Sequence, residues 1–318
     1  MPSSCPLTKQ WSGLGPFKVV ATVVLSLLAA LLIASLMTND VNLWIAWSRL
    51  GDEEFYMLVA VVLYYLLPQP QQGFTLIIAV LLSGSLNIAL KYTFNLPRPP
   101  DPLIDVSGPS FPSGHAQVSS SFWSSFSLMT RDAVIAIMSA IMVTGISSSR
   151  VFLRAHHVAD VVFGALIGCA LGCASYLALR HHSKRGSFIG YHVNAGVAVV
   201  LSAYNIIVLR AELNSSTTLL GLGLAALTIL LTLKFVRTIK PSNPAKVLAC
   251  IISITLLLGV HVTTRGYVPY VRLICFYVAG LCAFSMALAF QRLLKSFWRA
   301  TNCAGDVRDA KGLSIECS

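Results

Sequence analysis

The run VVATVVLSLLAALLIASLM at residues 19–37 is close to the roughly 20 apolar residues that cross a bilayer as one helix. Lys9 and Lys18 precede it, as basic residues precede the apolar core of a signal peptide. The run is longer than a typical signal core, however, and no convincing small-residue cleavage site follows it. We therefore expect this segment to be retained as the first membrane span.

Similar apolar segments recur along the chain. Hydrophobic residues make up 56% of the 318 residues and charged residues only 11%, against about a quarter charged in soluble domains. Because an isolated strand would leave backbone groups unsatisfied in lipid, every span is expected to be a helix. The sequence thus predicts an all-α, polytopic helical membrane protein. The ten expected spans lie near 18–37, 54–67, 74–93, 114–130, 132–149, 157–179, 190–209, 217–236, 245–263 and 270–291.

The formal net charge of +11 is explained by membrane topology better than by a nucleic-acid partner, and no such partner is expected. If the termini are inside, fifteen of the 23 basic residues fall on the inner side, as the positive-inside rule favours. The eight outer ones are Arg49, Lys91, Arg98, Arg150, Arg154, Arg210, Arg265 and Arg272. Four of these, from Lys91 to Arg154, cluster in a way that topology does not require.

The clustered basic residues belong to three outer segments. They are KYTFNLPRPP at 91–100, PSGH at 112–115 and SRVFLRAHHVAD at 149–160. The first lies at the outer end of the third span, the second at the start of the fourth, and the third at the junction of the fifth and sixth. All three segments meet if these four spans form a compact bundle.

The cations in these segments indicate a phosphate site. Lys91, Arg98 and Arg150 have few acids beside them, and uncompensated charge near hydrocarbon is costly and usually functional. Arginine offers bidentate donors to a phosphate, and lysine a point charge. Ser113 and Gly114 open a helix whose free N–H groups and positive dipole end add an anion cradle. Gly114 has no side chain to block the phosphate.

Two histidines supply the reactive groups. His156 and Asp160 are four residues apart and share one helix face, so the acid can hold one imidazole nitrogen protonated while the other attacks. His157 lies three residues from Asp160, and spacing alone does not exclude it. His115 lies beside the cradle, where a general acid would protonate a leaving oxygen. Together these groups suit phosphoryl transfer.

The expected outer face carries no Cys, His or carboxylate cluster with metal-ligand spacing, so we expect neither a metal nor another cofactor. Cys169 and Cys173 lie four residues apart on the sixth span, but neither histidine nor acid accompanies them. We interpret them as packing residues.

These three segments resemble the tripartite motif of the type 2 phosphatidic acid phosphatase (PAP2) superfamily, in its membrane-bound lipid phosphatase branch. That motif is Lys-x6-Arg-Pro, then Pro-Ser-Gly-His, then Ser-Arg-x5-His-x3-Asp. The matching residues are Lys91 with Arg98 and Pro99, Pro112 to His115, and Ser149 and Arg150 with His156 and Asp160. The resemblance covers about residues 50–180 and selects His156 over His157.

The resemblance implies a helical fold, metal-independent catalysis and a phosphohistidine intermediate. It implies that His156 attacks, that Asp160 orients His156 and that His115 protonates the leaving group. The phosphate-binding residues would be Lys91, Arg98, Ser113, Gly114 and Arg150. We expect a six-span PAP2-like core at 1–182, about four additional transmembrane helices at 183–293 and a cytoplasmic tail at 294–318.

The sequence leaves the substrate and the source open. Phosphatidate, phosphatidylglycerol phosphate, polyprenyl diphosphate and sphingoid phosphates all present a similar terminal phosphate. A phosphotransferase that uses the same histidine, and a lipid transporter or binding relative that uses only the cations, are the alternatives. We expect cytoplasmic termini, with the site on the periplasmic side of a bacterial inner membrane or, in a eukaryote, on the lumenal side of the endoplasmic reticulum.

Overall fold

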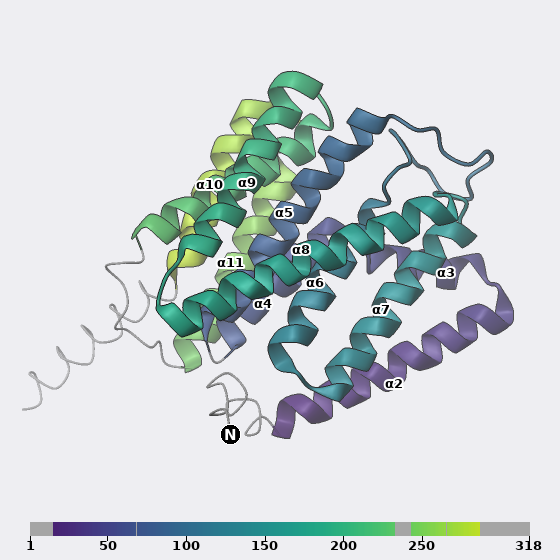
Figure 1. Cartoon of the computed structure of the whole chain (residues 1–318), viewed down its shortest axis with the longest axis horizontal. Coiled ribbons are helices and arrows are strands. Elements are labelled where there is room, and N and C mark those ends of the chain that lie inside the picture. The colour runs from purple at the N-terminus through teal and green to yellow at the C-terminus, as the bar shows by residue number, and fades with distance from the viewer. Residues whose placement is uncertain (1–14, 68, 233–242, 265, 287–318) are drawn as a thin grey trace, which may run out of the picture.

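The computed structural model describes residues 15–67, 69–232, 243–264 and 266–286, and within these ranges the fold is helical with no strand (Figure 1). The helices are α2 (Gly15–Thr38), α3 (Val41–Arg49), α4 (Glu53–Leu66), α5 (Pro70–Phe94), α6 (Gly114–Thr130), α7 (Ala133–Phe152), α8 (Val158–Arg185), α9 (Ile189–Tyr204), the π-helical turn η1 (Asn205–Leu209), α10 (Leu213–Thr232) and α11 (Asn243–Thr263). A further helix covers Pro269–Met286.

Eight helices in the described ranges are long and apolar enough to cross a membrane, which agrees with the polytopic fold expected from composition. Large apolar side chains such as Met37, Val200 and Ile207 are exposed on the outside of the helical bundle, where a bilayer would cover them. The tail expected at 294–318 and the span ends expected at 233–236 and 287–291 lie outside the described residues.

Two of the ten expected spans fall on shorter helices. The segment expected at 54–67 forms α4 with 14 residues, and the segment expected at 114–130 forms α6 with 17 residues. The α6 helix is polar as well as short, yet Ser119, Ser121 and Ser125 are fully buried. Their hydroxyl groups donate to backbone carbonyls, for example that of Ser125 to Gly172 O at 2.8 Å. Helix α6 therefore lies among protein neighbours, which satisfy polar groups that lipid could not.

A stripe of glycines on α8 allows α6 to pack closely. Gly164, Gly168 and Gly172 recur every four residues and so share one face of the helix. A Cβ atom at Gly164 would lie 2.7 Å from the Ser113 carbonyl oxygen, and one at Gly168 would collide with the Gln117 carbonyl. The two backbones therefore touch along α6, and this contact brings the start of α6 beside the start of α8.

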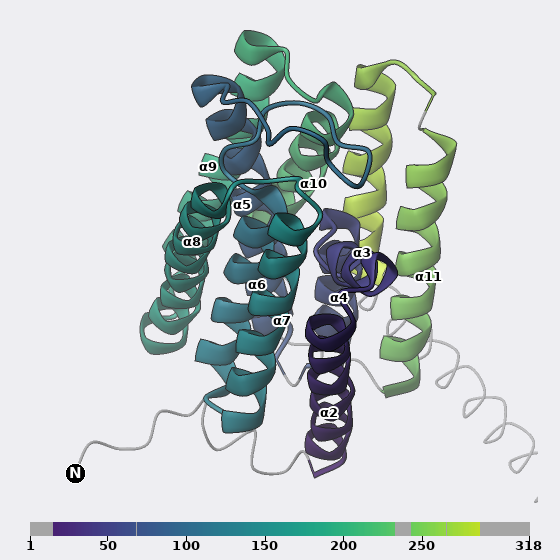
Figure 2. The ribbon, with the colours of Figure 1, turned by 90° about the vertical axis from the view of Figure 1, so that its right-hand side faces the viewer.

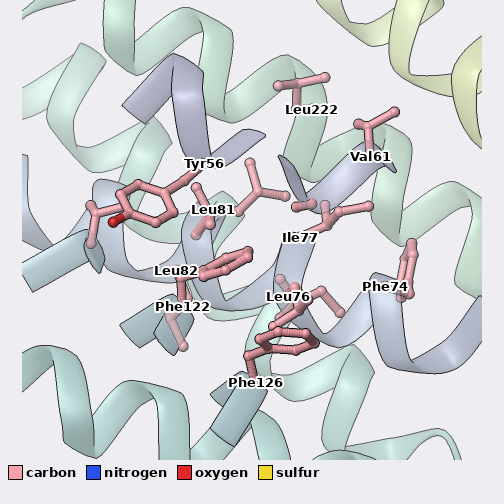
Figure 3. Packing of buried hydrophobic residues seen from close by; sticks show 14 of the residues in the cluster. Tyr56, Val61, Phe74, Leu76, Ile77, Leu81, Leu82, Phe122, Phe126 and Leu222 are labelled. Atoms are coloured by element: carbon pink, nitrogen blue, oxygen red, sulfur yellow. The ribbon is translucent and has the colours of Figure 1, made fainter. Parts of the chain in front are cut away.

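The core is formed mainly by α4, α5 and α6. Figure 3 shows Tyr56 of α4 and Phe122 of α6 near Leu81 of α5, and these rings have centroids 5.1 Å apart. The Tyr56 hydroxyl accepts a hydrogen bond from Trp123 Nε1 at 3.0 Å, so the buried polar groups of both rings are satisfied. Leu222 of α10 also reaches this cluster, which ties the later helices to the earlier ones.

The later helices pack directly on the earlier ones (Figure 2). Helix α9 contacts α5 and α8, α10 contacts α5, and α11 contacts α4. Asn205 in η1 donates from Nδ2 to the Ser85 carbonyl at 2.9 Å inside this contact. Helix α8 continues to Arg185, three residues beyond the boundary expected at 182, and the expected division into a core, additional helices and a tail stays a prediction.

The short helix α3 was not expected from the sequence. Asp40 caps it by accepting the Asn42 N–H at 2.8 Å. Its Trp47 is fully buried, and a Cβ atom at Gly145 of α7 would lie 2.5 Å from the Trp47 ring. Nine residues are too few to give a span signal, and it is this contact with α7 that brings Ser48 close to Arg150.

Candidate active site

The three polar segments meet at one end of the bundle, here called the site end. Helices α5 and α7 end there, and α6 and α8 begin there (Figure 1). The connection between α5 and α6 lies across the end of α7, because Leu103 N donates to Leu153 O at 3.0 Å. Ser110 N also donates to Leu96 O at 2.8 Å within this connection. Every site residue expected from the sequence lies at this end.

His156 and Asp160 form a buried pair. His156 Nδ1 lies 3.5 Å from Asp160 Oδ2, and both side chains are almost fully buried. Ser110, which the sequence did not indicate, stands between them: its hydroxyl donates to Asp160 Oδ2 and lies 3.3 Å from His156 Nδ1. The imidazole is thus held at one nitrogen by two oxygen atoms.

The other imidazole nitrogen faces a cation. His156 Nε2 lies 3.3 Å from Arg98 Nη1. A guanidinium can only donate hydrogen bonds, so this arrangement requires an unprotonated Nε2 and places the ring proton on Nδ1. The structure therefore presents the Nε2 lone pair beside the positive charge of Arg98, which is the arrangement that a nucleophile toward phosphate needs.

Burial favours the neutral form of this imidazole. Desolvation lowers the pKa of His156 to about 4, the Asp160 partner opposes that shift, and the positive charges of Arg150, Arg98 and Lys91 add to it. The same three cations that could bind a phosphate are therefore close enough to act electrostatically on the histidine. At neutral pH the imidazole is uncharged, and its Nε2 lone pair faces Arg98.

Asp160 also fixes the start of α8. Its Oδ2 accepts the backbone N–H of His157 at 2.9 Å, and its carbonyl oxygen accepts the N–H of Ser113 at 3.0 Å. His157 itself is exposed, and its side chain caps the start of α8 by accepting the backbone N–H of Asp160. Of the two adjacent histidines, it is His156 whose side chain points to the acid.

Arg98 is held rigidly by backbone oxygens. Its Nε donates to Gly108 O at 2.9 Å, Nη2 to Ser107 O at 2.7 Å and Nη1 to Ala155 O at 2.8 Å. The side chain therefore loses little further freedom when it binds a ligand, which is the benefit of a preorganised cation. Burial lowers the pKa of Arg98, but an arginine still carries its charge at neutral pH.

Two further site residues have buried polar atoms without partners in the described part of the chain. They are Arg150 Nε and Ser113 Oγ. Arg150 is buried, and its Nη1 donates to Ser48 Oγ of α3 at 2.5 Å. Buried donors of this kind are costly unless something binds them. An anion seated between Arg150 and the start of α6 would satisfy both.

The first turn of α6 supplies backbone donors. Gln117 N makes the first intrahelical bond, to Ser113 O at 3.0 Å, so the N–H groups of Gly114, His115 and Ala116 are not used by the helix. These N–H groups add to the positive end of the helix dipole.

Gly114 has a second role besides leaving room for a phosphate. A Cβ atom at Gly114 would lie 2.9 Å from Asn87 Oδ1 of α5. Asn87 in turn donates from Nδ2 to Pro112 O at 3.2 Å and to Gln117 Oε1 at 2.9 Å. The glycine therefore lets α6 start directly against α5, where Asn87 fixes both sides of the turn.

His115 has a partner that the sequence reading did not identify. Its Nε2 lies 3.1 Å from Asp52 Oδ1, and Asp52 precedes α4 and is about half exposed. A proton shared between these atoms can pass to an oxygen that comes within reach of the imidazole. The sequence did carry a feature that could have indicated this partner: Asp52, Glu53 and Glu54 are three consecutive acids at the end of an expected span.

The expectation that the cations have few acids beside them was incomplete. Glu212, in the connection before α10, places Oε1 4.0 Å from Lys91 Nζ. Its charge also acts on Arg98. This acid comes from the helices that follow the motif segments, so no local pattern around Lys91 could have indicated it.

Within the described residues, no group of three or more His, Cys, Asp or Glu side chains is arranged to hold a metal ion. Cys169 and Cys173 are exposed on α8.

In a comparison with protein families, the model of the PAP2 superfamily matches residues 72–184. That range contains nearly all of helices α5 to α8 and all eight residues expected at the site. Asp52, Ser48 and Glu212 lie outside it. Comparisons with curated proteins and with solved structures gave no match.

Proposed function

We propose that the protein is an integral-membrane lipid phosphatase, because residues 72–184 match the model of the PAP2 superfamily, which includes lipid phosphatases. It would hydrolyse the terminal phosphate of a lipid phosphate or diphosphate through a phosphohistidine intermediate. The chemistry needs no metal ion, because three cations and a helix start can neutralise the phosphate themselves.

One observation carries this proposal. A buried imidazole presents Nε2 to Arg98, and two polar atoms of the same site, Arg150 Nε and Ser113 Oγ, have no partner in the described ranges. A site for recognition alone would need the cations but not a nucleophile held by Asp160. The conjunction favours phosphoryl transfer over simple binding.

In the first step, the lone pair of His156 Nε2 forms a bond to phosphorus. The bond between phosphorus and the lipid oxygen breaks, and the electron pair leaves with that oxygen, which takes a proton from His115. Asp160 and Ser110 hold the Nδ1 side of the ring, so positive charge that develops on the imidazole meets a carboxylate. Arg98, Arg150, Lys91 and the start of α6 stabilise the transferring group.

In the second step, water attacks phosphorus from the side that the lipid alcohol has left. His115, now deprotonated, accepts the proton from that water, and the nitrogen–phosphorus bond breaks. Free phosphate and neutral His156 result, so both histidines return to their starting protonation states.

The direct test is phosphate release by the purified protein in the presence of EDTA. The panel contains phosphatidate, phosphatidylglycerol phosphate, a polyprenyl diphosphate and a sphingoid phosphate. We expect release from at least one of them that survives chelation. Activity that returns only after Mg²⁺ is added would exclude the metal-independent mechanism, and no release from any lipid would exclude the phosphatase.

The nucleophile is tested by comparing neighbouring histidines. His156→Ala should lower kcat at least ~10⁴-fold, as loss of a nucleophile does. It should also prevent the trapping of an acid-labile phosphoprotein. His157→Ala is the matched control and should stay close to wild type, because its side chain is exposed and contacts only the backbone N–H at the start of α8. A dead His157 variant beside an active His156 variant would reverse the assignment.

We also propose that the site faces the periplasm or an organelle lumen, with cytoplasmic termini. In a protein whose native cysteines are replaced, Ser107→Cys near Arg98 should react with an impermeant thiol reagent added from outside. Ser183→Cys at the opposite end of α8 should react only after the membrane is opened. The reverse labelling pattern would place the site in the cytoplasm and contradict this orientation.

A further inference from the structure

A groove opens beside the active site, between the early helices and the late ones. Helices α4 and α5 form one wall, and α10, α11 and the helix at Pro269–Met286 form the other. The groove spans about 710 Å³ of empty space when the part that is open to the surroundings is included. Most of its lining is apolar, so it is suited to hydrocarbon.

The groove is polar at the site end and apolar deeper in the bundle. On each of three helices, a polar and an apolar residue that line the groove are one turn apart. In every pair the polar residue lies nearer the site end. The pairs are Glu53 and Met57 on α4, Thr218 and Leu222 on α10, and His261 and Leu257 on α11. A lipid has the same polarity along its length.

The helix that follows α11 repeats this order. Arg272 lies near its start and donates from Nε to Thr218 Oγ1 at 2.9 Å, and its guanidinium lies 5.3 Å from the centre of the Phe276 ring one turn deeper. The buried Arg272 side chain therefore ties α10 to this last helix at the polar mouth of the groove.

The mouth of the groove adjoins the catalytic histidine that would protonate the leaving group. Asp52, whose carboxylate lies 3.1 Å from His115 Nε2, is followed in the chain by Glu53, which lines the groove. On the opposite wall, Ser215 lines the groove three residues after Glu212, which contacts Lys91. Residues that line the mouth therefore follow, within one to three positions in the chain, the residues that contact His115 and Lys91.

We propose that this groove holds the hydrocarbon chain of the lipid phosphate, so that the late helices serve to bind the substrate. This inference rests on the proposed phosphatase function. At the mouth, Glu53 and Glu54 stand against the single guanidinium of Arg272, so the mouth has no excess of positive charge. The phosphate therefore stays with Lys91, Arg98 and Arg150, and only the chain passes the mouth. The leaving oxygen then lies between the phosphate site and the mouth of the groove, near His115.

The activity test fills the groove and compares chain lengths. Met57→Trp on α4 and Leu257→Trp on α11 should each lower the ratio of kcat/KM for dioleoyl phosphatidate to kcat/KM for dihexanoyl phosphatidate at least tenfold. The short-chain substrate corrects for any general loss of folded protein. Ile251→Trp is the matched control, because it adds the same ring to α11 at an exposed position and should leave both values unchanged. An unchanged ratio in both groove variants would contradict the proposal.

A binding test stands independently of turnover. His156→Ala protein in nanodiscs is irradiated with a phosphatidate that carries a diazirine in its acyl chain, and the labelled peptides are mapped. We expect label on α4, α10 and α11 that excess phosphatidate removes and excess phosphatidylcholine does not. Removal by both lipids equally would mean an ordinary bilayer lipid in the groove and would overturn the proposal. If the label is specific but the wild-type protein releases no phosphate, the phosphatase function is excluded. The groove would then still be a binding site for a lipid phosphate.

Discussion

Lys91 Nζ lies 4.0 Å from Glu212 Oε1, although α6, α7, α8 and α9 separate the two residues in the chain. The lysine belongs to the segment matched by the family model, and the glutamate belongs to the connection that leads into α10. Lys91 is largely buried, whereas Glu212 is about one third exposed. The late helices thus place a negative charge at the edge of the proposed phosphate site.

Replacing Glu212 with glutamine should strengthen inhibition by inorganic phosphate roughly 3- to 10-fold, because one nearby negative charge is removed in a partly screened environment. The measurement is the inhibition constant of phosphate at low and high salt, and the effect should shrink at high salt. Asp101→Asn, at an exposed acid in the connection between α5 and α6, is the control and should change little. Weaker phosphate inhibition in the glutamine variant would mean that Glu212 positions Lys91 instead.

Ser110→Ala should lower kcat about 10- to 100-fold with little change in KM. The variant removes a hydrogen bond to the buried carboxylate of Asp160, and bonds to charged groups of this kind contribute roughly 1.5–3 kcal/mol. The phosphate-binding residues are untouched, so substrate affinity should persist. Ser107→Ala is a suitable control, since Arg98 contacts only the backbone oxygen of that residue. An equal rise in KM would show that Ser110 acts on binding.

The acid titration of His156 should lie near pH 4, well below the value of about 6.5 for a free histidine. Burial and the nearby cations disfavour the charged imidazole, so the neutral, nucleophilic form persists as the pH falls and is lost only around the lowered pKa. The measurement is a ¹³C NMR titration of labelled histidine, with the His156 signal assigned by its absence from the His156→Ala spectrum. A midpoint at or above pH 6.5 would contradict the burial seen here.

Gly168→Ala should lower the melting temperature by several degrees, because its Cβ would collide with the Gln117 carbonyl and force α6 away from α8. Gly196→Ala on α9 is the matched control: a Cβ there meets nothing within 4 Å, and alanine is the better helix former. The readout is thermal unfolding in detergent. Equal melting temperatures for both variants would mean that the two helices are not packed this closely.

The sequence by itself determined the helical membrane class and the three polar segments. Both depend on local patterns: apolar runs of bilayer length, and fixed spacings such as that between His156 and Asp160. The local pattern was less informative where a polar helix is buried by its neighbours. Helix α6 was expected to be a span, but with 17 residues it is not among the helices long and apolar enough to cross a membrane.

Only the tertiary structure decided which residues complete the site and where a lipid chain could lie. Asp52 meets His115, Ser48 meets Arg150 and Glu212 meets Lys91 across long stretches of chain. The groove needs side chains from the early and late helices together. A single serine or acid has no spacing that marks its partner, because such contacts are set by how helices pack, as the glycines of α8 set the position of α6.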